Sequence, residues 1–223
     1  MVAAGGDAAV PNRLTATTLG EYAAQLAARD PDLAAIHKQL GPPPLCGRPP
    51  TFATLVRIIL EQQVSLASAR GTFERFREAL GGRVTVAAVR AAEANVFRAS
   101  GFSRQKTRYT QQLADNIGRR RFSLGRLQVL ANDEVRLALT SQVGLGPWSA
   151  DVYLLLALKR ADIFPVGDLA LRKGMEEVSG SRLATPQQAE ARAEAWRPYR
   201  SVATRMIWQA YLHRRGASLQ DQL

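Results

Sequence analysis

The segment Gln142-Val143-Gly144-Leu145-Gly146-Pro147-Trp148-Ser149-Ala150, residues 142–150, lies between two stretches with helical periodicity. Two glycines that flank one leucine let a chain turn sharply and approach another surface closely, while the leucine anchors the turn in a core. Pro147 suits the first position of a helix. That helix would offer unpaired N–H groups and the positive end of its dipole, which suit a phosphate oxygen. The pattern predicts either an ordinary turn between two helices or a hairpin that binds a nucleic-acid backbone.

The rest of the chain has the pattern of successive helices. N-cap residues and apolar spacing predict helices over residues 18–29, 31–40, 52–80, 85–92, 103–117, 132–141, 147–159 and 198–214, with a further helix after Thr185. Strand signals are nearly absent. The sequence therefore predicts an all-α protein.

Two regions interrupt the helical pattern. Residues 1–16 are rich in alanine and glycine without periodicity, which predicts a disordered tail. The prolines of GPPPLCGRPP, residues 41–50, lack backbone donors and restrict the residues before them, so this segment is predicted to be a linker. We therefore predict two helical lobes with a cleft between them: a terminal lobe of residues 17–50 and 165–223, and a central lobe of residues 51–164 with the hairpin at 142–147.

Composition narrows the class of protein. The 223 residues include 30 Lys and Arg against 19 Asp and Glu, a net charge of +11 that is typical of proteins that bind polyanions. One cysteine and two histidines exclude a disulfide framework, a cysteine-rich zinc site and a four-cysteine iron–sulfur cluster. No metal and no cofactor is predicted. Without a long apolar run or a secretory signal pattern, the chain is predicted to be soluble and cytoplasmic, and associated with the nucleoid if bacterial.

Four colinear segments resemble the helix-hairpin-helix superfamily of base-excision DNA glycosylases, and in particular its 3-methyladenine DNA glycosylase II branch. They are the hairpin at 142–150, the Gln-Gln-Val-Ser signature at 62–65, the segment LLLALKRADIFPVGDLALRKG at 154–174, and EAWRPYRSVATRMIW at 194–208. The resemblance covers residues 51–212. It implies that the partner is duplex DNA with a damaged base, and that the flipped nucleotide occupies the cleft between the lobes.

The resemblance also implies that Asp168 is the catalytic carboxylate. Breaking an N-glycosidic bond builds oxocarbenium character on the sugar, which a nearby anion stabilises, and the same group can orient or deprotonate water. Asp168 also precedes Leu169, the start of a predicted helix, where an aspartate often serves as N-cap, and both roles are compatible. Strand-cutting members of the superfamily carry a lysine nucleophile at the position of Trp148. The resemblance therefore implies a monofunctional hydrolase without lyase activity.

Aromatic and amide side chains are the candidates for the base pocket. By resemblance, Trp148 and Trp208 line this pocket, where electron-rich rings stack on the cationic ring of an alkylated purine; the alternative for both is core packing. Gln62 and Gln63 interrupt an apolar helix, and such amides either satisfy neighbouring backbone groups or, as the resemblance implies, line the cleft. The branch often has a tyrosine where this chain has Val152, which leaves the choice among methylated, deaminated and etheno bases open.

The resemblance assigns contact with the DNA backbone to the hairpin and to the start of the helix after residue 103. These residues are Val143, Gly144, Leu145, Gly146, Ser149, Ser103 and Lys106. Basic side chains concentrate in two regions, with nine Lys and Arg over residues 98–136 and six Arg over residues 192–215. Both regions are candidates for binding phosphates.

We therefore expect a monomeric, monofunctional DNA glycosylase that hydrolyses the N-glycosidic bond of 3-methyladenine and 7-methylguanine in base excision repair. Two alternatives stay open. The same fold could act on deaminated or etheno bases, or the chain could be a non-catalytic helix-hairpin-helix module that clamps the DNA backbone.

Overall fold

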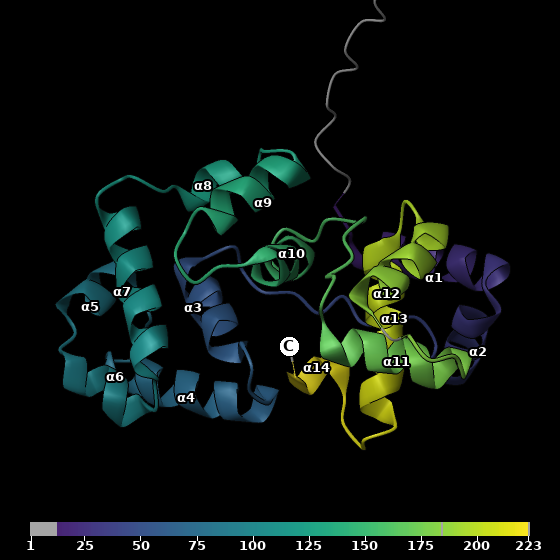
Figure 1. Ribbon diagram of the computed structural model, residues 1–223, viewed down its shortest axis with the longest axis horizontal. Helices are drawn as coiled ribbons and strands as arrows, with labels where there is room; N and C mark the ends of the chain where they lie inside the picture. The colour runs from purple at the N-terminus through teal and green to yellow at the C-terminus, as the bar shows by residue number, and fades with distance from the viewer. Residues whose placement is uncertain (1–12, 184, 223) are drawn as a thin grey trace, which may run out of the picture.

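Helices make up the regular structure of residues 13–183 and 185–222, the part of the chain that the computed structural model describes (Figure 1). Over these residues the only β-type pairing is an isolated bridge between Arg13 and Arg160. The all-α prediction is confirmed. In chain order the elements are α1 Ala16–Arg29, α2 Pro31–Leu40, α3 Phe52–Glu61, α4 Leu66–Ala79, α5 Val86–Ala91, α6 Ala94–Ser100, α7 Arg104–Gly118, α8 Leu124–Leu127, α9 Asn132–Thr140, α10 Pro147–Leu156, α11 Leu169–Ser179, α12 Pro186–Ala193, the 3₁₀ turn η1 Glu194–Trp196, α13 Arg200–His213 and α14 Leu219–Gln222.

Side-chain caps begin several helices at the residues that the sequence indicated. The side chains of Asp30, Thr85, Ser103 and Thr185 each accept a hydrogen bond from a backbone N–H in the first turn of α2, α5, α7 and α12. Asn132 is instead the first residue of α9, whose N-cap is Ala131. Local capping chemistry therefore determines most of the helix starts.

The helices form two groups with α10 between them, as Figure 1 shows. On one side α13 packs against α1, α2 and α11; on the other α3 packs against α4 and α7, α4 against α6, and α5 against α7. α10 contacts both α3 and α9, and its residues from Ser149 to Leu156 are all buried, as expected for a helix that is apolar almost all round. Hydrogen bonds from Trp148 to Asp168 and from Arg205 on α13 to Leu155 join α10 to the other group as well.

The prediction of one continuous helix over residues 52–80 is wrong, because these residues form two helices, α3 and α4. α3 ends at Glu61, Gln62 is extended, Gln63 has a φ of +59°, and the side chain of Ser65 caps α4. Gln62, Gln63 and Ser65 therefore lie on a turn and not within one helical turn. The turn at residues 62–65 has neither glycine nor proline, so its local sequence does not indicate a break in the helix.

Several ends and short elements also differ from prediction. Residues 1–12 of the predicted tail lie outside the described residues, but the tail prediction is wrong for 13–16, because Leu14 is buried and its N–H donates to the carbonyl of Lys159 at 2.8 Å. α10 ends at Leu156 and not at Lys159, which has a φ of +55°. The short helices α6 and α8 were not predicted: α6 has no side-chain N-cap, and α8 has only four residues.

Candidate active site and DNA interface

Asp168 is located at the N-terminus of α11. Gly167 before it has a φ of +96°, a conformation that favours glycine, and this turn leads the chain into the helix. Oδ1 of Asp168 accepts a hydrogen bond from the backbone N–H of Leu171 at 2.7 Å. The N-cap role is confirmed. The carboxylate is only partly buried, so the cap also presents an anion at the molecular surface.

Two tryptophans donate their indole N–H groups to this same carboxylate. Nε1 of Trp148, in the first turn of α10, lies 2.9 Å from Oδ2 of Asp168. Nε1 of Trp208, on α13, lies 3.2 Å from Oδ1. Trp208 is 8% exposed and Trp148 is half-buried. The structure thus brings together the predicted catalytic residue and both tryptophans predicted for the base pocket, from three separate helices.

The charge of Asp168 is held by dipoles and not by a cation. Among the described residues no Lys, Arg or His nitrogen lies within ion-pair distance of its carboxylate. Three N–H donors and the positive end of the α11 dipole stabilise the anion instead. No neighbouring cation therefore offsets the charge of this carboxylate.

The hairpin between α9 and α10 places its two glycines in different surroundings. Gly144 has a φ of +88°, and a Cβ there would lie 2.2 Å from ring atoms of Tyr109. Gly146 has an ordinary φ of −92°, and no atom lies within 4 Å of where its Cβ would be. Leu145 between them is buried. The fold therefore requires glycine at 144, whereas the open side of Gly146 leaves room for another molecule.

One amide fastens the hairpin to the end of α3. Nε2 of Gln62 donates to the carbonyl of Gly144 at 2.7 Å and to Oγ of Ser149 at 3.0 Å. Gln62 thus satisfies a neighbouring backbone, which is the first of the two roles considered for it, while Gln63 is exposed. Ser149 is 2% exposed, so its hydroxyl faces Gln62 and only its backbone N–H, in the first turn of α10, suits the predicted phosphate contact.

The family model described as the HhH-GPD superfamily base excision DNA repair protein matches residues 56–198. The chain belongs to this superfamily. It is 26% identical to DNA-3-methyladenine glycosylase 1 of Schizosaccharomyces pombe over 161 residues, 70% of this chain and 71% of that protein. The solved structure of an S. pombe 3-methyladenine DNA glycosylase in complex with abasic DNA matches with a TM-score of 0.75 at 24% identity, over 85% of this chain and 95% of that one.

The fold is also that of a glycosylase named for a different damaged base. A Clostridium acetobutylicum 8-oxoguanine glycosylase/lyase in complex with DNA matches with a TM-score of 0.74 at 18% identity, over 88% of this chain and 70% of that one. The resemblance to base-excision glycosylases is therefore confirmed at the level of the superfamily. The fold by itself is compatible with more than one damaged base.

Lys106 makes contacts that differ from the predicted one. Its Nζ donates to the carbonyls of Leu60 at 2.7 Å and Gln62 at 2.9 Å, at the C-terminal end of α3. Partial burial lowers the pKa of this ammonium. The side chain therefore holds the turn after α3, while Ser103, whose Oγ caps α7, stays exposed as a candidate for phosphate contact.

Two further contacts position the hairpin, and both were missed in the sequence. The ring of Tyr109 on α7 packs against Gly144, and Nδ2 of Asn116 on the same helix donates to Oε1 of Gln142 at 2.9 Å. Tyr109 and Asn116 are two turns apart on one face of α7, which is the only sequence signal that links them. The polar Gln142 at the start of the hairpin is thereby explained.

Val152 and Tyr153 are both in the core. Val152 is 3% exposed, and Tyr153 is fully buried, which raises the pKa of its hydroxyl. Tyr153 therefore does not replace the tyrosine that the resemblance leads one to expect at position 152.

The two basic regions differ in what their arginines contact. In the C-terminal region Arg192 pairs with Asp30, Arg197 and Arg200 pair with Asp162 and Glu194, Arg214 and Arg215 pair with Glu177, and Arg205 is fully buried. Seven arginines of the other region are exposed and have no carboxylate within ion-pair distance among the described residues: Arg98, Arg104, Arg108, Arg119, Arg120, Arg121 and Arg126. The charge available to a polyanion therefore concentrates on α6, α7 and the turns after them.

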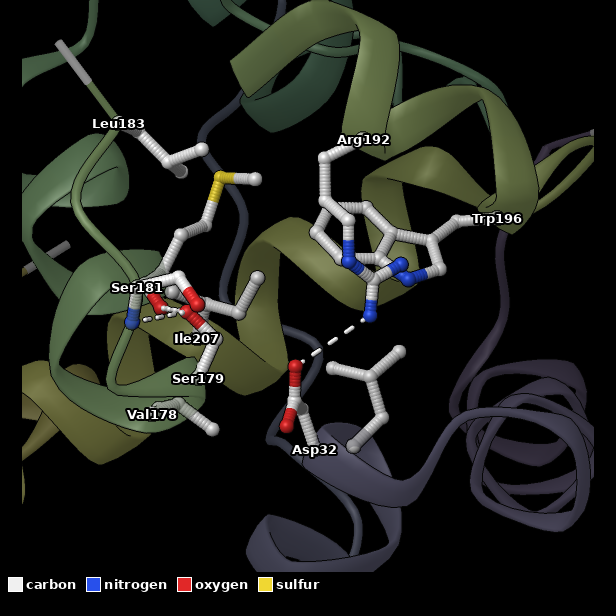
Figure 2. Close-up of a pocket in the computed structure, with 10 residues that line it drawn as sticks. Asp32, Val178, Ser179, Ser181, Leu183, Arg192, Trp196 and Ile207 are labelled. Carbon is white, nitrogen blue, oxygen red and sulfur yellow. Dashed lines mark hydrogen bonds and ion pairs between the residues drawn. The ribbon is translucent and has the colours of Figure 1, made fainter. Parts of the chain in front are cut away.

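A cavity of about 250 Å³ lies beside the C-terminal half of α11, away from Asp168 at its other end. Figure 2 shows Arg192 and Trp196 on one side of it and Asp32 on the other, with Arg192 paired to Asp32 at 3.3 Å. Its charged groups satisfy each other, so we regard it as part of the packing of α2, α11 and α13.

The described part of the chain has no helix long and apolar enough to cross a membrane. Nor does it contain three or more His, Cys, Asp and Glu side chains grouped so as to hold a metal ion.

Proposed function

We propose that this HhH-GPD protein is a DNA N-glycosylase that removes alkylated purines, 3-methyladenine and 7-methylguanine, after they have flipped out of duplex DNA. The observation that carries the proposal is the meeting of Asp168 with Trp148 and Trp208 at one partly exposed carboxylate. An anion beside two aromatic rings suits a cationic base attached to a sugar that becomes cationic. The similarity to S. pombe DNA-3-methyladenine glycosylase 1 supports the same substrate class.

In the proposed reaction the bond between C1′ of the sugar and the purine nitrogen breaks, and the electron pair leaves with the base. Alkylation has already made the base cationic, so it departs as a neutral purine without a proton from the protein. The sugar develops oxocarbenium character, which the negative charge of Asp168 stabilises. Water then bonds to C1′, and its proton passes to Asp168 or to solvent.

The proposed reaction ends at an abasic site with the strand intact. A glycosylase that also cuts the strand needs an amine nucleophile to form a Schiff base with the sugar. At the start of α10 the side chain in reach of Asp168 is the indole of Trp148, which cannot form an imine. Hydrolysis by water is therefore the chemistry that these residues support.

We propose that the duplex lies across the two helix groups, that is, a terminal lobe of residues 17–50 and 165–223 and a central lobe of residues 51–164, with its backbone at the hairpin. The open side of Gly146 and the N–H groups in the first turn of α10 suit a phosphate oxygen. The exposed arginines of residues 98–126 supply positive charge on the same side as α7, which packs against the hairpin. The protein is expected to act as a monomer.

The test is release of free base from duplex DNA that has been methylated so that it contains 3-methyladenine and 7-methylguanine. Wild-type protein should release both bases, leave alkali-labile abasic sites, and give no covalent DNA adduct with borohydride. A panel of duplexes with deaminated and etheno bases, run at the same protein concentration, ranks the substrates. Binding of the same duplexes is measured in parallel.

Three outcomes would contradict the proposal in different ways. Binding without release of any base from the panel would leave only a backbone clamp. Release confined to deaminated or etheno bases would overturn the substrate class but not the reaction. A borohydride-trapped adduct would overturn hydrolysis by water.

A further inference from the structure

The carboxylate of Asp168 has almost all of its acceptor positions occupied. A carboxylate offers about four lone-pair positions, two on each oxygen. Oδ1 accepts from the N–H of Leu171 and from Nε1 of Trp208, and Oδ2 accepts from Nε1 of Trp148. One position, on Oδ2, has no partner among the described residues. The two oxygens are therefore not equivalent.

We propose that Trp148 and Trp208 are positioning residues whose indole N–H groups orient Asp168, so that Oδ2 is the oxygen that faces the sugar and the water. This inference rests on the proposed glycosylase function and goes further, because it assigns these tryptophans a role besides base stacking. It also divides the carboxylate into an anchored oxygen, Oδ1, and a working oxygen, Oδ2.

The geometry of indole links the two roles. The N–H bond lies in the plane of the ring, so a hydrogen bond to Asp168 fixes the edge of each ring without covering its faces. Trp208 is 8% exposed, so the half-buried Trp148 is the ring that can offer a face to a base. Trp148 comes from α10 and Trp208 from α13, so the carboxylate is held from two helices as well as by its own helix. A base that stacks on Trp148 is thereby placed at a set distance from Oδ2, to which this ring donates. The same ring would then both stack on the base and hold the carboxylate in place.

The molecule contains a matched control for this interaction. Trp196, the remaining one of the three tryptophans in the chain, donates its Nε1–H to Oδ2 of Asp30 at 2.7 Å, and Asp30 caps α2 as Asp168 caps α11. The donor, the acceptor and the capping role are the same. Asp30 is buried and paired with Arg192, outside the proposed site. Removing the Trp196 N–H therefore deletes the same type of hydrogen bond at a place where no catalytic consequence is expected.

The first experiment replaces each tryptophan separately by 3-benzothienylalanine, in which sulfur takes the place of N–H and the ring area is kept. Release of 7-methylguanine is measured under single turnover, and the Kd is measured on a duplex with a stable abasic analogue. At 148 or 208 the rate should fall about 10- to 100-fold, as expected for one hydrogen bond to a charged group, with the Kd unchanged. At 196 the melting temperature should fall and the rate should not.

The second experiment needs no substitution at the tryptophans. The protein labelled with ¹⁵N at indole gives three Nε1–H resonances, one for each tryptophan. Asp168→Asn should move two of them and Asp30→Asn the third, because each indole loses a charged acceptor. This readout remains available if a benzothienyl variant fails to fold.

The inference is overturned if both benzothienyl variants at 148 and 208 keep the wild-type rate, or if rate and Kd weaken by the same factor, which is the result for a stacking surface alone. It is also overturned if Asp168→Asn moves fewer than two indole resonances. Failure of the proposed function is a separate result, since it requires that wild-type protein release no alkylated base.

Discussion

Asp30 and Asp168 perform the same structural task in two regions of the molecule. Each is the N-cap of a helix, α2 or α11, and each accepts an indole N–H. They differ in their other partners. Asp30 is 5% exposed and pairs with Arg192 at 2.6 Å, whereas Asp168 is partly exposed and takes a second indole in place of a cation.

The difference shows how a capping residue becomes available for chemistry. Arg192 neutralises Asp30, and Figure 2 shows this arginine beside Trp196 and opposite Asp32. An anion that is already neutralised has little attraction left for a second positive charge. Asp168 is stabilised by N–H dipoles only, so no counter-charge neutralises it and its negative charge can stabilise a sugar cation. The helix fold needs both residues, and we propose that catalysis needs only one.

The largest effect is expected for Asp168→Asn. Asparagine caps a helix as well as aspartate does, so we expect the melting temperature to change little. Base release under single turnover should fall about 10²- to 10⁴-fold, because the negative charge beside the sugar is removed. Release of 7-methylguanine is compared with a thermal melt of the same sample. Full activity in this variant would remove the distinction between the two aspartates.

The reciprocal variant, Asp30→Asn, should lower stability and leave the rate per folded molecule unchanged. Burial alone raises the pKa of Asp30, but hydrogen bonds from Trp196 and Arg192 outweigh it, so the pKa lies below its usual 3.8. At pH 7 the loss of stability should be about 3 kcal/mol, as for a broken buried ion pair.

The pH dependence of this loss follows from the direction of the pKa shift. The stabilisation by Asp30 is fully present above the unfolded pKa near 3.8 and is lost as the pH falls through the lower folded pKa. Urea unfolding between pH 7 and pH 2.5 should therefore show wild type and Asp30→Asn converging in acid. A difference between them that stays constant over this range would contradict the assignment.

The two hairpin glycines repeat the contrast between a residue that the fold needs and one left to a ligand. Gly144→Ala should lower the free energy of unfolding by about 2 kcal/mol, because the residue has a positive φ and faces Tyr109. Gly146→Ala should be neutral in stability, since its Cβ meets nothing, and should weaken duplex binding about tenfold by crowding a phosphate. Urea unfolding and binding titrations separate them. Equal effects of both variants on stability would contradict this.

The smallest effect concerns paired and unpaired arginines. Replacing Arg119, Arg120 and Arg121 by glutamine should reduce the slope of log Kd against log salt by about 1 for each DNA phosphate that is no longer neutralised. Arg197→Gln is the matched control, because Arg197 is also exposed but pairs with Asp162 and Glu194. Its slope should stay at the wild-type value. Equal slopes in both variants would mean that the unpaired arginines do not bind DNA.

The sequence predicted what depends on neighbours along the chain. Caps such as Asp30, Ser103 and Asp168 accept hydrogen bonds from N–H groups two or three residues ahead, so a few consecutive residues are enough to predict them. The segments that carry Asp168, Trp148 and Trp208 also resemble one superfamily, which is why these residues could be singled out from the sequence.

What the sequence could not show depends on interactions across long separations. The break after Glu61 is held by Gln62, which bonds to Gly144 82 residues away, and by Lys106, which bonds to Leu60 46 residues away. Their local sequence favours a continuous helix. Several C-terminal arginines also have distant partners, such as Arg192 and Asp30, which are 162 residues apart, and Arg215 and Glu177, which are 38 residues apart. The number of basic residues in the sequence is therefore larger than the number of basic side chains that have no acidic partner and could bind DNA.

Arg205, fully buried on α13, affects how the molecule unfolds. Its guanidinium donates to the carbonyls of Ser201, Cys46 and Leu155, which belong to α13, to the proline-rich linker and to α10. Burial lowers its pKa to about 10, so it is still charged at neutral pH and has to be desolvated by all three segments together. The group that contains α13 therefore cannot separate from α10 without exposing a charge and its carbonyls at the same moment. This group and α10 should melt as a single cooperative unit and not one after the other.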